Sequence, residues 1–338
     1  MDNIFDNIFN WIDNNKGKSK FNLTASGMDY NIFLNSGIDF SREEFIKKGP
    51  SAEEDLYQII SEIYGVETNE IMSTNGGSEA IQIGSLFLAR ESERINVPVP
   101  EYEPMYLVPE RYMFKIRRIG DNENFSLKRN ESLSFTDPNN PTGDMVSKKD
   151  PYREAMENNL TYCDETFSEF RFPQKPETSF VKYENSITST TFTKFYGTGF
   201  LRIGYMFASG ERIAKLKEYR RLSSGSVNYF SLYMAAKILE KRSYFVREIK
   251  NIIERNRNIV KSKLSKAGFD FSSPDNSSTC FVRGEYSYEW CQRLRDEKGV
   301  LVIPGRYFGV EKGFRICFTT SPEIISEALD IIGEFKGE

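Results

Sequence analysis

The sequence predicts an α/β protein in which a mostly parallel sheet is flanked by helices and is followed by a small α/β domain. Two observations predict this class. Between about residues 66 and 209, short apolar segments typical of strands alternate with longer segments typical of helices. In the last third, long helical segments precede short strands and a final helix. We therefore expect a large domain at residues 39–225 and a small domain formed by residues 1–38 and 226–338.

The chain begins with an expected amphipathic helix that lacks the basic region of a signal peptide. Its apolar face carries Ile4, Phe5, Ile8, Phe9 and Ile12. A second helix is expected after Gly49-Pro50, with Ser51 and Glu54 as a capping box and Gly65 as its end. The buried stripe of this helix is expected to be Leu56, Ile59, Ile60 and Ile63.

Seven strands and one early helix are expected in the alternating region. The helix follows Gly76-Gly77 at Ser78–Arg90, and the strands are Ile71–Ser73, Ile95–Val99, Phe114–Ile119, Leu133–Thr136, Leu160–Asp164, Ile187–Thr193 and Arg202–Ser209. Polar residues follow the carboxyl ends of these strands, where open α/β sheets bind their ligands. Later, helices are expected at about 211–222 and 228–265, strands near 279–283, 299–303 and 314–319, and a final helix from Ser321-Pro322.

The composition excludes several classes of protein. The 338 residues contain no histidine, so neither a Ser-His-Asp triad nor a histidine-ligated metal is possible. The net charge of -4 does not favour nucleic acid, and no apolar run is long enough to span a membrane. The four cysteines have no CxxC spacing and are expected to be reduced, as in a cytoplasmic protein. Proton transfers would fall to Lys, Asp, Glu, Tyr or Cys.

Four segments carry the candidate chemistry, and each has an ordinary alternative explanation. Thr74–Ala80 contains a Gly-Gly turn that opens a helix, which suits an anion but is common as a simple turn. Ser134–Gly143 places Asn140 between two prolines after a strand, although Asn-Pro turns are frequent. Leu160–Glu165 delivers Asp164 to a strand end, where a helix-capping Asp is the alternative. Thr191–Gly204 surrounds Lys194 with hydroxyls and glycines, although a lone lysine is usually solvated.

Together these segments resemble the fold-type I, pyridoxal-phosphate (PLP)-dependent aminotransferases of class I and II, especially the histidinol-phosphate aminotransferase-like branch. The resemblance covers roughly residues 20 to 335. Its strongest matches are the PNNPTG segment at 138–143, the Asp164-Glu165 pair, and Thr191-x-Thr193-Lys194 followed by Arg202 eight residues later. The resemblance implies an enzyme that moves an amino group between an amino acid and a 2-oxo acid.

The resemblance also implies a role for individual residues. Lys194 would hold PLP as a Schiff base and move the substrate Cα proton, and Asp164 would pair with the pyridine nitrogen. Asn140 would donate to the phenolic oxygen, Tyr102 would stack on the ring, and Arg315 would bind the substrate carboxylate. The phosphate would be held by backbone and hydroxyl groups of Gly77, Ser78 and Glu79, helped by Thr191, Thr193 and Arg202.

Two positions depart from the family pattern. Phe167 occupies the place of a usual tyrosine that donates to the phenolic oxygen, and Lys47-Lys48 stands where a tyrosine often reaches the partner subunit's phosphate. Lys48 would either replace that tyrosine as a point charge or be solvated.

Two other functions share the same motifs. One is a decarboxylase that resembles threonine-phosphate decarboxylase, and the other is a catalytically silent PLP-binding protein, which Phe167 would favour. The resemblance and the apolar N-terminal face both lead us to expect a homodimer. The segment 20–45 is expected to form part of the substrate wall, but it does not identify the substrate.

Overall fold

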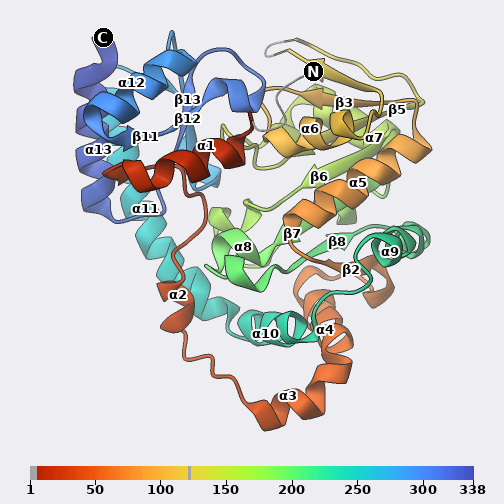
Figure 1. Cartoon of the computed structure of the whole chain (residues 1–338). Helices are drawn as coiled ribbons and strands as arrows, with labels where there is room; N and C mark the ends of the chain where they lie inside the picture. Colours follow the sequence, from red (N-terminus) through yellow and green to blue (C-terminus); the bar gives the residue numbers. More distant parts are fainter. Residues whose placement is uncertain (1–5, 121–122) are drawn as a thin grey trace.

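The computed structural model describes residues 6–120 and 123–338, so Ile4 and Phe5 of the expected apolar face lie outside the described residues. Its centre is a seven-stranded sheet with the order β2-β8-β7-β6-β5-β3-β4 (Figure 1). The strands are β2 (Ile71–Thr74), β3 (Arg94–Pro98), β4 (Ile116–Ile119), β5 (Glu131–Thr136), β6 (Leu160–Asp164), β7 (Ser186–Thr191) and β8 (Gly204–Phe207). Strands β3 to β7 are parallel, whereas β8 is antiparallel to β2 and β7. The expected α/β class is confirmed.

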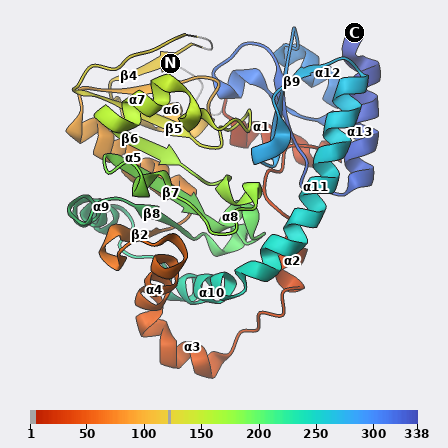
Figure 2. The same ribbon diagram turned by 180° about the vertical axis from the view of Figure 1, so that it is seen from behind.

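Helices cover both faces of this sheet (Figures 1 and 2). They are α5 (Gly77–Glu91), α6 (Glu103–Arg111) and α9 (Gly210–Ser223) on one face and α7 (Asp150–Asn158) on the other. The neighbouring residues Tyr162 and Cys163 belong to different apolar clusters, because successive side chains of a strand point to opposite faces. This double cover explains why the central strands are buried along their whole length.

A further group of helices lies below the β2 end of the sheet (Figure 1). Helix α4 (Ala52–Tyr64) packs against α10 (Tyr229–Glu240), α3 (Arg42–Lys48) contacts α10, and α2 (Asn31–Leu34) contacts the long helix α11 (Arg242–Lys266). Leu56 and Ile60 of α4 are fully buried, and α4 ends at Gly65 in the left-handed conformation, as expected. The expected capping box is wrong, because the Ser51 side chain makes no cap hydrogen bond and donates to the Lys48 carbonyl oxygen at 3.2 Å.

The C-terminal third forms a second, smaller sheet with the order β12-β13-β10-β9. Its strands are β9 (Asp270–Phe271), β10 (Thr279–Arg283), β12 (Ile303–Pro304) and β13 (Phe314–Cys317), and its helices are α11 (Arg242–Lys266), α12 (Tyr288–Lys298) and α13 (Pro322–Glu334). The helix expected over 228–265 is broken at Lys241, whose Nζ donates to the carbonyl oxygens of Ser36 and Gly37. This anchorage explains the break, since it fixes the chain between α10 and α11.

The N-terminal segment packs on the small sheet, although the two are far apart in the sequence. Strand β1 (Phe21–Asn22) pairs in parallel with β11 (Val300–Leu301). The expected N-terminal helix is α1 (Ile8–Asn15), and its Ile8 and Trp11 are buried in an apolar cluster with Phe308. The apolar face of α1 is therefore partly covered by its own chain, so this face is a weaker argument for a dimer than the sequence suggested.

The limits of the two domains stay a prediction. Helix α10 packs against α4, and α11 runs from there to the small sheet (Figure 2). In the part of the chain that the structure describes, no helix is both long enough and apolar enough to cross a membrane.

Candidate active site

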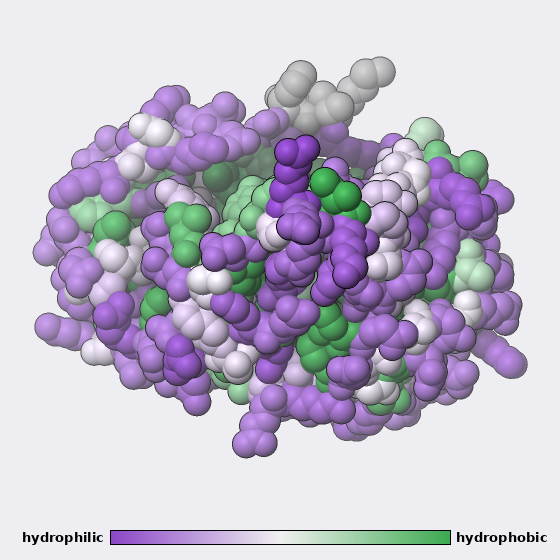
Figure 3. All heavy atoms as spheres, turned by 90° about the horizontal axis from the view of Figure 1, so that it is seen from below, coloured by the Kyte–Doolittle hydropathy of each residue, from purple (hydrophilic) through white to green (hydrophobic). Residues whose placement is uncertain are grey.

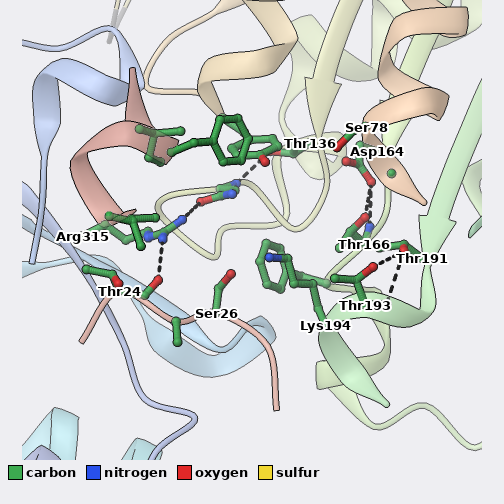
Figure 4. Close-up of a pocket in the computed structure, with 18 of the residues that line it drawn as sticks. Thr24, Ser26, Ser78, Thr136, Asp164, Thr166, Thr191, Thr193, Lys194 and Arg315 are labelled. Carbon is green, nitrogen blue, oxygen red and sulfur yellow. Dashed lines mark hydrogen bonds between the residues drawn. The ribbon is translucent and has the colours of Figure 1, made fainter. Parts of the chain in front are cut away.

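A cavity of about 370 Å³ lies at the carboxyl ends of the parallel strands. Residues from the large sheet, from β13 of the small sheet and from the N-terminal segment all line it. Figure 4 shows Ser78, Asp164 and Thr191 on one side, Arg315 and Thr24 on the other, and Lys194 between them in this view. The cavity thus lies where α/β folds place their ligands, and its walls come from distant parts of the sequence.

Lys194 projects into this cavity from the short helix α8 (Phe192–Phe195), which begins directly after β7. Thr191 caps the helix by accepting a hydrogen bond from the Thr193 backbone N–H. On the other side, Met28 N donates to the Lys194 carbonyl oxygen at 2.7 Å. Burial of the ammonium and the nearby charge of Arg315 lower the pKa of Lys194 to about 8. The neutral amine, which a nucleophile or a base requires, is therefore still the minority form near physiological pH, but it is far more abundant than in an ordinary lysine.

Asp164 ends strand β6 and is buried at the cavity floor. Its Oδ1 accepts hydrogen bonds from the Thr166 backbone N–H at 3.0 Å and from the Thr166 hydroxyl at 2.5 Å. Burial raises the pKa of Asp164 to about 6, while the Thr166 donors and the Lys194 charge oppose this rise. Glu165 leaves the strand in another direction and bonds to Ser179, away from this cavity.

The cavity has an anion-binding end at the start of α5. Gly77 and Ser78 are the first residues of this helix, where backbone N–H groups have no partner within the helix. Gly76 precedes them with a φ of 78°, and a Cβ at this position would lie 3.0 Å from Arg202 Nη2. Only glycine therefore fits between the helix start and the guanidinium.

Two threonine hydroxyls line the same end of the cavity. Thr191 and Thr193 place their hydroxyl oxygens 2.8 Å apart. Hydroxyls, a guanidinium and free N–H groups are together the donor set that a phosphate prefers.

Asn140 and Arg315 meet on the opposite side of the cavity. Arg315 is 2% exposed, and its Nη1 donates to Asn140 Oδ1 at 2.8 Å. Its Nη2 donates to the Thr24 carbonyl oxygen at 3.1 Å. Among the described residues, Arg315 Nε is buried without a hydrogen-bond partner. Because Asn140 Oδ1 is occupied, the amide NH₂ of Asn140 is left to donate to a ligand, and the free edge of Arg315 suits a carboxylate.

A buried carboxylate holds the loop that carries Asn140. Glu101 accepts hydrogen bonds from Thr136 N at 2.8 Å, from the Thr136 hydroxyl at 2.6 Å and from Tyr102 N at 2.6 Å. The Thr136 hydroxyl oxygen in turn accepts from Asn140 N at 2.8 Å. Burial raises the pKa of Glu101 to about 8. One side chain thus ties the loop of Asn140 to Tyr102.

The structure brings ten of the eleven predicted site residues to this cavity. They are Gly77, Ser78, Tyr102, Asn140, Asp164, Thr191, Thr193, Lys194, Arg202 and Arg315. Glu79 does not line it, because its carboxylate turns back and accepts a hydrogen bond from Asn75 N at 2.6 Å. Lys48 lies outside the cavity, half-exposed, 3.6 Å from Glu44. Phe167 lines the cavity, as its place in the motif implied.

Several lining residues were not singled out from the sequence. Thr166 could have been found, since a hydroxyl two residues after an aspartate commonly bonds back to it. The α1 residues gave no local signal, because only the folded chain brings them to the cavity. The segment 20–45, expected to form part of the substrate wall, reaches the cavity at Asn22, Thr24, Ala25 and Ser26.

Comparisons with known proteins agree with this architecture. The family model described as aminotransferase class I and II matches residues 48–332. Aromatic-amino-acid aminotransferase 2 of Thermococcus litoralis is 28% identical over 290 residues, which cover 77% of this chain and 74% of the relative. Aspartate aminotransferase of Thermotoga maritima is 25% identical, with 95% and 92% covered. Histidinol-phosphate aminotransferase of Pyrococcus furiosus is 24% identical, with 88% and 85% covered.

Solved structures are similar over nearly the whole chain. The crystal structure of a PLP-dependent aminotransferase from Streptococcus suis has a TM-score of 0.80 at 20% identity and covers 96% of this chain and 95% of that one. The fold is that of fold type I, and together with the family match it defines a PLP-dependent enzyme. The family match extends over most of the chain, and the chain belongs to the class I and II aminotransferase family. It is a PLP-dependent aminotransferase, and the relatives give no support to the decarboxylase alternative.

The residues of the cavity fit this cofactor. A partly neutral amine, a buried carboxylate and a phosphate-type donor set lie around one cavity, and the glycine at position 76 leaves room beside Arg202. In the part of the chain that is described, no cluster of side chains could hold a metal ion.

Proposed function

We propose that Lys194 carries PLP covalently and, once released, moves the proton at the substrate Cα. The observation that supports this most is the meeting of Lys194, Asp164 and Arg315 in one cavity, with the pKa of the amine lowered to about 8. When bound, PLP supplies an electron sink for the electrons that remain at Cα after the proton leaves. A base with a pKa near the working pH is effective at such a proton transfer.

We assign the remaining cofactor contacts to the residues around it. Asp164, oriented by the two Thr166 donors, would hold the pyridine nitrogen and keep it protonated. Asn140 would donate through its amide NH₂ to the phenolic oxygen, and Tyr102 would pack on the ring. Gly77, Ser78, Thr191, Thr193 and Arg202 would hold the phosphate. Glu79 would contribute only its backbone N–H, because its carboxylate is bonded to Asn75 and does not line the cavity.

The substrates are an amino acid and a 2-oxo acid, as the family implies. We propose that Arg315 binds the α-carboxylate that both substrates share. Arg315 is buried and held by Asn140 and Thr24, so its guanidinium is positioned before the substrate enters. Fixed donors lose little entropy on binding, which favours a defined position of Cα relative to Lys194.

Attachment of the cofactor tests this assignment directly. Purified protein loaded with PLP should absorb in the visible range and lose that band on reduction with borohydride. Peptide mapping should then find the pyridoxyl group on Lys194. Lys194→Ala should retain PLP without a covalent bond and react orders of magnitude more slowly, because the base is gone. A pyridoxyl group on a different lysine would refute the proposal.

We also propose that the enzyme is a homodimer in the cytoplasm. All four cysteines are free and buried, which suits a reducing compartment. Exposed apolar side chains gather near α2, α3 and α10, including Leu34, Phe40, Ile46 and Phe230. Figure 3 looks onto the side of the molecule that carries these helices, where apolar atoms interrupt a hydrophilic surface. Such a patch commonly marks an interface.

Solution mass tests the oligomeric state. Light scattering at micromolar concentration should give the mass of two chains. Ile46→Asp should weaken the dimer, because Ile46 is 65% exposed within the patch. Met113→Asp is the matched control, since Met113 is also exposed and apolar but lies after α6 on the far side of the sheet. A fully active monomer would contradict the proposal.

A further inference from the structure

The helix α1 borders the cavity on the side where the substrate enters beside Arg315. Ile8, Phe9, Ile12 and Lys16 of α1 line the cavity. In Figure 4 the faint red ribbon of α1 lies on the same side of the pocket as Arg315. Asp164 and the anion-binding end of the cavity lie on the opposite side, so α1 does not border the proposed cofactor phosphate site. The side chain of an amino acid held by Arg315 would therefore have α1 as a neighbour.

The wall formed by α1 is largely apolar. Phe9 is 50% exposed and Ile12 is partly exposed, and both side chains line the cavity. Ile81 of α5 and the ring of Tyr102 add further apolar surface to the same cavity. An apolar ligand group between these side chains would release water from both partners.

This wall is held in place at both ends of α1. At its start, Ile8 N donates to Glu103 Oε2 of α6 at 2.7 Å. In its middle, Trp11 Nε1 donates to the Val302 carbonyl oxygen at 2.9 Å. Near its end, Arg295 Nη1 donates to Asn15 Oδ1 at 2.9 Å. Since α1 is bonded to both the large sheet's helices and the small domain, its cavity face is a preformed surface.

The described lining offers little to a second carboxylate on the substrate. Its cationic side chains are Lys16, Lys194, Arg202 and Arg315. The last three have proposed roles, and Lys16 is a solvent-exposed lysine whose Nζ bonds to Asp13 Oδ1 at 2.7 Å. A carboxylate at the end of a substrate side chain would face Ile8, Phe9 or Ile12 without a buried cation, and an exposed, solvated lysine compensates little for the desolvation of that charge.

We propose that α1 forms the subsite for the substrate side chain, that Phe9 and Ile12 determine its specificity, and that the enzyme prefers amino acids with apolar or aromatic side chains over dicarboxylic ones. This inference rests on the proposed roles of Lys194 and Arg315. Burial of an apolar side chain of the size of leucine commonly changes a rate constant by about tenfold to a few hundredfold.

The half-reaction with a single amino acid and no 2-oxo acid tests the preference without interference from an acceptor. The visible band of the PLP-loaded enzyme reports the reaction. Leucine, methionine and phenylalanine should react with a kcat/KM at least about tenfold above that of aspartate or glutamate. Calorimetry measures binding without reaction. The dissociation constant of 4-methylpentanoate, which has no amine and cannot react, should be lower than that of succinate.

Two variants locate the preference on α1. Phe9→Ala and Ile12→Ala should each lower kcat/KM for leucine by about tenfold and leave aspartate within about twofold. Met113→Ala, a change at an exposed apolar residue far from the cavity, should leave the ratio of the two substrates unchanged.

The results separate this inference from the proposed function. A pyridoxyl group on Lys194 together with a faster reaction of aspartate or glutamate would overturn only the inference. Equal losses for leucine and aspartate in both α1 variants would also overturn it. Absence of reaction with every amino acid, or PLP on another lysine, would instead refute the proposed function.

Discussion

Removal of the Arg315 guanidinium should weaken catalysis through loss of the substrate carboxylate contact. Arg315 has five N–H donors, and among the described residues the hydrogen bonds to Asn140 and Thr24 occupy two of them. The Nε donor is buried and free among the described residues. A carboxylate in this cavity would therefore gain a charge-assisted pair that water cannot easily replace. Loss of such a pair costs about 2–5 kcal/mol, or roughly 30-fold to several thousandfold in kcat/KM.

Steady-state kinetics of Arg315→Ala and Arg315→Lys measure this loss. The lysine variant should recover little activity, because a point charge cannot form the two-pronged contact and cannot also hold Asn140. An amine substrate that lacks the carboxylate should be nearly unaffected, so the selectivity for amino acids over amines should collapse. Arg257→Ala serves as a control, since Arg257 bonds to backbone carbonyl oxygens outside the cavity. Near-normal kcat/KM for Arg315→Ala would show that another group binds the carboxylate.

Three further predictions concern the cofactor end of the cavity. Thr166→Val removes the hydroxyl bond to Asp164, and the dissociation constant for PLP should rise about tenfold by equilibrium dialysis, which Thr178→Val should not reproduce. Phe167→Tyr should lower the pH at which the visible band shifts, provided that a structure places the new hydroxyl at the phenolic oxygen. An unchanged or higher value would contradict our account of this residue. In the PLP-free chain, the lowered pKa means that Lys194 is protonated more in the unfolded state than in the folded state between pH 8 and 10.5. The free energy of unfolding, measured in urea, should therefore rise across this range by up to about 3 kcal/mol more in the wild-type chain than in Lys194→Met. An equal dependence of this free energy on pH in both chains would argue against a lowered pKa.

Local sequence was sufficient for most of the fold because its signals are short-range. The apolar strand segments and the Gly65 helix stop follow from backbone and burial preferences within a few residues. Ser321 caps the final helix as expected, with Pro322 at the first position. The failures have tertiary causes: Lys241 interrupts a continuous helical pattern because its amine is tied to the segment at Ser36. Ser51 loses its cap because a preceding 3-10 turn redirects its hydroxyl.

The residues of the candidate site also fall into two groups, those that local motifs predict and those that only tertiary contacts place there. Asn140, Asp164 and Lys194 stand in short motifs at strand ends, and parallel strands bring such ends together at one edge of a sheet, so the sequence by itself determined the chemistry of the cofactor. The position of α1 depends on contacts between residues up to about three hundred positions apart. The direction of the Glu79 carboxylate depends on the rotation of its side chain toward Asn75. No local sequence pattern specifies either feature. Tertiary structure alone decided that α1 borders the site, because the pairing of β1 with β11 and the packing of the N-terminal segment on the small sheet place this helix at the cavity.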